Sequence, residues 1–157
     1  QVAQGLRFLI SPACSDYMFD LRDGAMSVDE RRRALLSIRD LYTLCFQERC
    51  EPVMYCRGES RSAINELCYD WWDVIPFPVP QHPQGDLLTE AVVEVLGTTV
   101  RLANPACIES SLRGLGIVGW QRPDLTRPII AEFLATASGA REELMEYARN
   151  AAEGYPT

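Results

Sequence analysis

The clearest helical signal in this chain lies in residues 62–76, SAINELCYDWWDVIP. Its apolar residues recur at the spacing of one helix face, and they are Ile64, Leu67, Cys68, Trp71, Trp72 and Ile75. Ser60 or Ser62 can cap the start of this helix, and Pro76 ends it because proline cannot continue the hydrogen-bond ladder. The segment therefore predicts an amphipathic helix with one buried face.

A longer helix is predicted before it. Residues 27–30, Ser-Val-Asp-Glu, form a capping box, in which the serine hydroxyl and the glutamate carboxylate satisfy two free backbone N–H groups. An apolar stripe follows at helical spacing: Leu35, Ile38, Leu41, Tyr42 and Cys45. We expect about five turns of helix, ended by Glu51-Pro52.

The second half of the chain predicts four more helices after a proline-rich segment. Residues 76–85, PFPVPQHPQG, predict an extended crossing segment. The expected helix starts are Asp86, Asn104-Pro105 and Thr126 or Arg127 before Pro128. Ser138-Gly139 breaks the third of these helices, and the last helix carries Leu144, Tyr147, Ala148 and Ala151. Gly154 and Pro156 end the last helix.

These helices predict an all-α protein. Two pairs begin near Asp86 and Thr126, a step of about 40 residues, which is the period of HEAT and armadillo units. We expect an α-α superhelix of about three helical pairs within one domain spanning residues 1–157. Residues 1–26 are expected to be irregular, and the absence of a starting methionine suggests a piece of a longer chain.

Four stretches also carry a resemblance: residues 67–73 (LCYDWWD), residues 104–116 (NPACIESSLRGLG), the Ile129-Ile130 helix and the Glu143-Leu144 helix. Together they resemble a group of uncharacterised bacterial proteins with HEAT-like helical repeats. The resemblance implies an α-solenoid fold over roughly residues 17–155 and no particular reaction.

Composition excludes several classes of function. The chain has 157 residues, with 15 basic residues that are all arginine, 22 acidic residues and a net charge of −7. This acidity argues against nucleic acid as a partner. The lack of lysine excludes Schiff-base and P-loop lysines, and one histidine excludes a multi-histidine metal site. We therefore expect no cofactor, and no apolar stretch is long enough to predict a membrane span.

The six cysteines predict reduced core thiols in a cytoplasmic protein. Cys45 and Cys68 lie on the apolar stripes of two predicted helices, so both are expected to be buried. The spacing of Cys45, Cys50, Cys56 and Cys68 lacks the CxxC pairs of zinc ribbons, so no metal site is predicted.

Cys107 is the candidate reactive thiol. It lies in the first turn of the helix after Asn104, where the helix dipole can lower a thiol pKa. His82 is the one histidine that can serve as its base. The alternative is a small side chain packed at a tight helix junction. Paired carboxylates such as Asp70 and Asp73 offer another catalytic candidate, with a solvated helix face as the alternative.

The candidate binding surface consists of Trp71, Trp72, Phe77 and His82. Neighbouring helix positions differ by about 100°, so we expect one tryptophan in the core and the other partly exposed. The alternative is that both are buried beneath the proline-rich segment.

The most consistent function is a non-enzymatic protein-interaction or scaffold module whose partner is another protein. One rival is a small hydrolase-like enzyme that uses a cysteine or an acidic cleft. Another is a host-directed effector that avoids ubiquitination because it lacks lysine.

Overall fold

The computed structural model describes residues 1–11, 13–14, 21, 26–74 and 83–155. Every regular element in these residues is a helix, which confirms the predicted all-α class. The elements are α1 (Val2–Ile10), α2 (Val28–Leu41), the π-helical turn η2 (Tyr42–Phe46), α3 (Gln47–Arg49), α4 (Ala63–Val74), α5 (Pro83–Thr99), α6 (Pro105–Gly119), α7 (Pro123–Thr136) and α8 (Glu142–Ala152).

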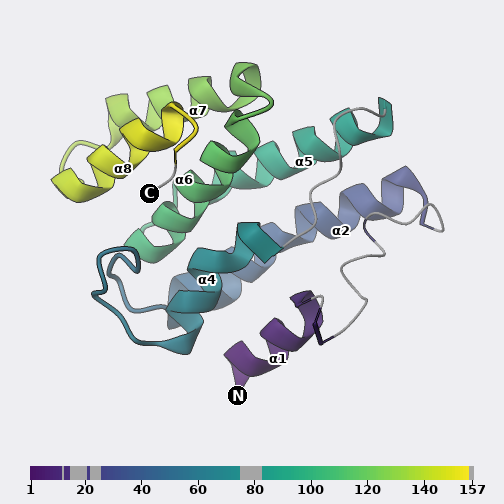
Figure 1. Cartoon of the computed structure of the whole chain (residues 1–157), viewed down its shortest axis with the longest axis horizontal. Coiled ribbons are helices and arrows are strands. Elements are labelled where there is room, and N and C mark those ends of the chain that lie inside the picture. Colours follow the sequence, from purple (N-terminus) through teal and green to yellow (C-terminus); the bar gives the residue numbers. More distant parts are fainter. Residues whose placement is uncertain (12, 15–20, 22–25, 75–82, 156–157) are drawn as a thin grey trace.

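The long helices pack in two layers (Figure 1). In one layer α5 lies between α2 and α7, and in the other α6 lies between α4 and α8. The layers meet where α5 packs on α6 and where α7 packs on α8. Helix α6 therefore contacts four other helices and forms the centre of the core, whereas α1 packs against α4 at one edge.

The two predicted helix caps are present. The Ser27 hydroxyl accepts from the Glu30 N–H at 3.3 Å, and the Glu30 carboxylate accepts from the Ser27 N–H at 2.9 Å. The Asn104 side chain accepts from the Ala106 N–H at 3.0 Å, with Pro105 as the first helical residue. Both caps are local in sequence, so the residues that form them could be recognised without knowledge of the fold.

The helix that starts at Val28 changes its winding before it ends. Its last turns pass through η2, which places Tyr42 and Phe46 in the core and leaves Leu44 75% exposed. A π-helical turn holds more residues than an α-helical one, so the apolar stripe shifts in register. Cys45 is consequently only half-buried, and the expectation that it is buried was wrong.

The expectation of an irregular segment over residues 1–26 is corrected by α1. Ile10 is buried, and Ala3 and Leu6 pack against the core from the same face of this short helix. These three residues are spaced three and four apart, as on one face of a helix. The segment is too short for this period to be recognised from the sequence.

Two helices begin earlier than expected. Helix α5 starts at Pro83 rather than Asp86, so the extended segment does not reach residue 85, and residues 75–82 lie outside the description. Helix α7 starts at Pro123, with Pro128 inside it. Proline fits a first helical turn, and the earlier start of α7 brings Thr126 into the buried face.

Candidate functional site

Both tryptophans of the candidate binding surface belong to the core. Trp71 is 4% and Trp72 0% exposed, so the expected difference between them was wrong. Trp72 stacks on Tyr42 with ring centroids 6.0 Å apart, and Trp71 meets Phe46 edge-on at 5.6 Å. Phe77 and His82 lie outside the described residues. Of the four residues predicted to form a binding surface, the two that are described are therefore both buried.

Cys107 is fully buried in the first turn of α6. Its thiol lies beside Cys68, whose pKa is raised well above its usual value by burial and then by the neighbouring Cys107 and Cys50 thiols. A thiol enclosed in this way cannot reach a substrate in solvent. Within the described ranges no three histidine, cysteine or acidic side chains are arranged to hold a metal ion.

Asp70 and Asp73 of α4 lie in different environments. Asp73 binds Arg113, with 2.6 Å between Oδ2 and Nε. Asp70 is half-buried, and burial, followed by the nearby Asp73 and Glu66 carboxylates, raises its pKa. Neither side chain is among those that line the cavities described below.

A buried carboxylate that the sequence did not single out lies on α6. Glu109 is fully buried and accepts hydrogen bonds from the Tyr55 N–H at 2.7 Å and the Cys56 N–H at 3.1 Å. Burial raises the pKa of Glu109. Burial and the adjacent Glu109 carboxylate raise the pKa of the Cys56 thiol to about 12. Glu109 thus anchors the loop between α3 and α4 to the central helix.

The same side of the molecule carries an arginine–tyrosine cluster. The Arg113 guanidinium donates to the Tyr69 hydroxyl at 2.8 Å and lies 4.5 Å from the centre of the Tyr69 ring. A nearby pocket of about 190 Å³ is lined by Cys56, Arg57, Glu146, Tyr147 and Asn150. Its two charges pair with each other at 2.9 Å, so neither is left uncompensated for a charged substrate.

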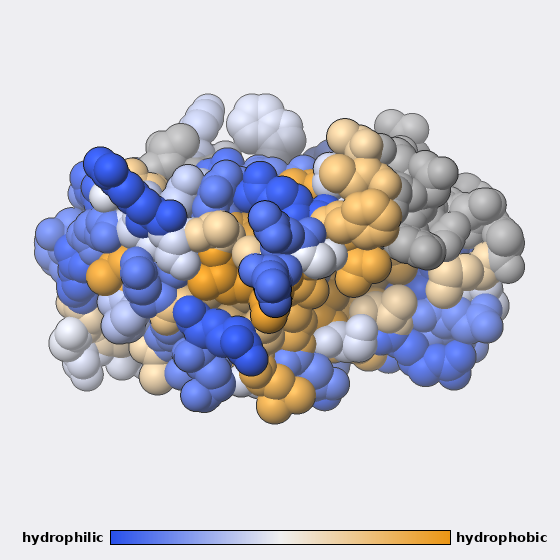
Figure 2. Space-filling view, turned by 90° about the horizontal axis from the view of Figure 1, so that it is seen from below, coloured by the Kyte–Doolittle hydropathy of each residue, from blue (hydrophilic) through white to orange (hydrophobic). Residues whose placement is uncertain are grey.

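An apolar groove lies between α1 and α2. It has a volume of about 350 Å³, and its walls include Leu6 and Leu9 from α1, Ile38 and Leu41 from α2, and Trp71 from α4. Figure 2 shows hydrophobic residues gathered across the middle of the face seen from below, with hydrophilic residues on both sides. On α1, Phe8 is 52% exposed.

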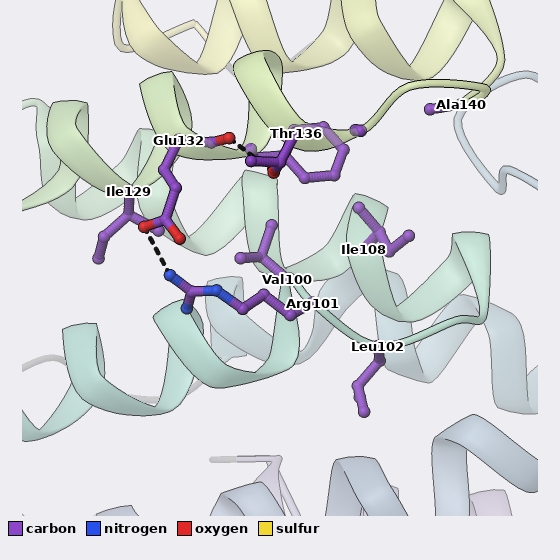
Figure 3. Close-up of a pocket in the computed structure, with 10 residues that line it drawn as sticks. Val100, Arg101, Leu102, Ile108, Ile129, Glu132, Thr136 and Ala140 are labelled. Carbon is purple, nitrogen blue, oxygen red and sulfur yellow. Dashed lines mark hydrogen bonds and ion pairs between the residues drawn. The ribbon is translucent and has the colours of Figure 1, made fainter.

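A second pocket, of about 270 Å³, lies where α5, α6 and α7 approach one another (Figure 3). Val100, Ile108 and Ile129 supply apolar walls. Arg101 reaches across to Glu132, with 2.7 Å between the charged atoms. Because this ion pair is already satisfied, the pocket offers a ligand little beyond apolar contact.

The exposed tryptophan is Trp120, which is not among the candidate residues predicted from the sequence. It is 69% exposed at the end of α6, and its ring meets that of exposed Tyr155 at 6.2 Å and 76°. Gly154, at φ +84°, allows the C-terminal chain to turn beside the indole. Two features of the sequence could have identified this site, because Trp120 lies off the apolar stripes and just before the Pro123 helix start.

Comparisons with protein-family models, with curated proteins and with solved structures found no match for this chain. In the described residues, no helix is both long and apolar enough to cross a membrane.

Proposed function

We propose that this chain is a non-enzymatic protein-interaction module built as a HEAT-like superhelix of three helical pairs. The two-layer order supports this architecture, because α2, α5 and α7 follow one another in one layer and α4, α6 and α8 in the other. Stacked helical pairs present extended surfaces to partners. The burial of Cys107 and the pairing of Asp73 with Arg113 weigh against the enzyme alternatives.

The observation that carries the proposal is the exposure of Trp120 beside Tyr155. Tryptophan and tyrosine dominate interaction hot spots because they bury a large apolar area and still offer a polar group. The two rings meet edge to face, and the turn at Gly154 brings the C-terminal chain beside the indole, so the rings form one contiguous aromatic surface. We define the Trp120–Tyr155 pair as the aromatic surface.

The partner proposed for the aromatic surface is a basic segment of another protein. A net charge of −7 attracts cations over a distance and raises their association rate. An indole face is the best aromatic partner for an arginine or lysine side chain. The neighbouring Arg122 is neutralised by Asp124 through bonds of 3.0 and 2.8 Å, which lowers its repulsion of such a partner.

A cytoplasmic location is part of the proposal. All six cysteines are among the described residues, and none of them forms a disulfide. Free thiols in these numbers suit a reducing compartment.

The test is selection from a displayed library of random peptides, followed by affinity measurement on the enriched sequences. We expect enrichment of arginine- and lysine-containing peptides, with binding that weakens as salt rises. Trp120→Ala should reduce affinity about 30-fold, the loss typical of a hot spot. Leu44→Ala, a change at a similarly exposed apolar residue elsewhere, should leave it unchanged. Binding unaffected by Trp120→Ala, or no enrichment of basic peptides, would contradict the proposal.

A further inference from the structure

The turn after α8 brings Tyr155 beside the end of α6. This turn is a Schellman motif, in which the Gly154 N–H donates to the Ala151 carbonyl at 3.0 Å. The N–H of Tyr155 donates to the Asn150 carbonyl, also at 3.0 Å. Gly154 has the positive φ, +84°, that the motif requires. The Tyr155 backbone is therefore hydrogen-bonded to α8 where its ring meets the Trp120 indole.

The two rings form a corner that is open to solvent. Their planes stand at 76° with the centroids 6.2 Å apart, so a face of the indole and a face of the phenol border the same space. Trp120 is 69% and Tyr155 62% exposed. The Trp120 N–H donates to the Gly116 carbonyl at 3.2 Å. The corner is thus built by two backbones that are each hydrogen-bonded to a different helix.

The charged residues next to the corner offset one another. Arg122 pairs with Asp124 at 2.8 Å. Arg127 donates to the Ala152 carbonyl at 3.4 Å, and Glu153 is exposed one residue further along the chain. These four side chains carry no net charge. The net charge of −7 on the whole chain still favours a cationic ligand, and the choice among cations falls to the rings.

Aromatic faces favour a particular kind of cation. They attract positive charge but are weak hydrogen-bond acceptors. A lysine ammonium has three N–H donors and is strongly hydrated, so it loses good hydrogen bonds when it moves from water onto a ring. Methylation keeps the charge and replaces the donors with methyl groups that can pack on aromatic faces. Two faces at nearly a right angle can contact such a group from two sides.

We propose that the aromatic surface binds a trimethylated lysine of the partner protein, with the trimethylammonium group in the corner between the Trp120 and Tyr155 rings. This inference rests on the proposed function, because it narrows the basic partner segment to a modified one. The net charge of this chain attracts the other basic residues of that segment, and the corner distinguishes the methylated lysine from an unmodified one.

The test compares three short peptides that differ only at a central residue flanked by arginines. That residue is lysine, trimethyllysine or a neutral analogue in which a tert-butyl group replaces the trimethylammonium. Binding to the whole chain is followed in ¹H–¹⁵N spectra through the Trp120 indole signal, which is identified by its loss in Trp120→Phe. Trimethyllysine should bind about five-fold more tightly than either other peptide, the upper gain for a cation on an exposed ring.

Two variants at Tyr155 test the second wall of the corner. Tyr155→Phe keeps an aromatic ring and should retain the preference for trimethyllysine, whereas Tyr155→Ala should remove most of it. Tyr155 is exposed and follows the last helix, so both variants should fold as the native protein does. An equal preference in the two variants would contradict a corner made of both rings.

The outcomes separate this inference from the proposed function. If the lysine peptide binds through Trp120 and trimethylation adds nothing, the inference is wrong and the proposed function stands. If none of the peptides binds, both fail. A neutral analogue as tight as trimethyllysine would show apolar contact alone and overturn the inference. Phosphatidylcholine vesicles present the same trimethylammonium group, so binding to them without a preference among the peptides would also overturn it.

Discussion

The three tryptophans occupy two kinds of environment. Trp71 and Trp72 are enclosed in the core and Trp120 lies on the surface. We expect Trp71→Ala and Trp72→Ala each to lower the free energy of unfolding by about 3–5 kcal/mol, because each leaves a large cavity. Trp120→Ala should change it by about 0.5 kcal/mol or less. Urea unfolding of the three variants checks this, and a small loss for either core tryptophan would contradict the packing described.

The buried Glu109 carboxylate gives stability a specific pH dependence. Its folded-state pKa is raised by burial, so the folded protein holds this proton more tightly than the unfolded chain does. The stabilisation linked to that proton is complete below the unfolded value and is lost as pH rises through the folded pKa. Above that pKa, the folded state bears the cost of a buried charge.

Comparison with Glu109→Gln isolates this effect. The stability of the native protein relative to the variant should fall as pH rises from about 4.5, the ordinary glutamate value. Exposed carboxylates such as Glu59, whose pKa is lowered mainly by Arg141, act in the opposite direction but are present in both proteins. Denaturant unfolding over a pH series provides the measurement, and a difference that is flat or rises with pH would exclude a raised pKa.

The limits of sequence reasoning are clearest at these residues. Periodicity placed Leu67 and Cys68 in the core correctly, but it wrongly predicted that one of Trp71 and Trp72 is partly exposed. Helices pack on α4 from more than one side, so both tryptophans are buried although they point in different directions from the helix axis. Glu109 stands in a polar run, Glu-Ser-Ser, that is typical of a solvated face. Its burial follows from the four helices around α6, which no local pattern records.

Among the elements, α6 depends on a close approach to its neighbours. A Cβ added at Gly114 would lie 2.5 Å from Leu96 Cδ2 and 2.9 Å from Trp72 Cγ. We expect Gly114→Ala to cost about 1–3 kcal/mol through overpacking. Gly5→Ala is the matched control, because a Cβ there meets no atom within 4 Å and alanine favours helix by about 0.5–1 kcal/mol. Thermal unfolding of both variants should show shifts of opposite sign, and equal shifts would argue against the close packing.

Helix caps and helix registers differ in what a sequence can show. Ser27 and Asn104 were predictable as caps because the donor and acceptor lie within three residues of each other. The turn η2 and the start of α7 were not, because each is chosen by packing with distant helices. Pro123 and Pro128 are both suitable first residues of a helix. The start at Pro123 is favoured because it buries Thr126, which the sequence alone does not show.

At the scale of the whole molecule, the packing of both layers around α6 predicts that the protein unfolds as one cooperative unit. The reactivity of the cysteine thiols can test this. Cys14 and Cys56 are exposed, whereas Cys50, Cys68 and Cys107 are buried around the base of α6. In the native protein an alkylating reagent should modify Cys14 readily. Cys56 should react much more slowly despite its exposure, because its pKa of about 12 leaves little thiolate near pH 8.

The three buried thiols should be modified only through unfolding and at one shared rate, because Cys50 just after α3, Cys68 on α4 and Cys107 on α6 belong to one core. Mass spectrometry of peptides after timed alkylation measures each site. Reaction of Cys107 well before Cys68 would show that α6 opens separately from α4, against a single cooperative domain. Glu109→Gln adds a second test, because removing the carboxylate beside Cys56 should lower that pKa and speed its alkylation.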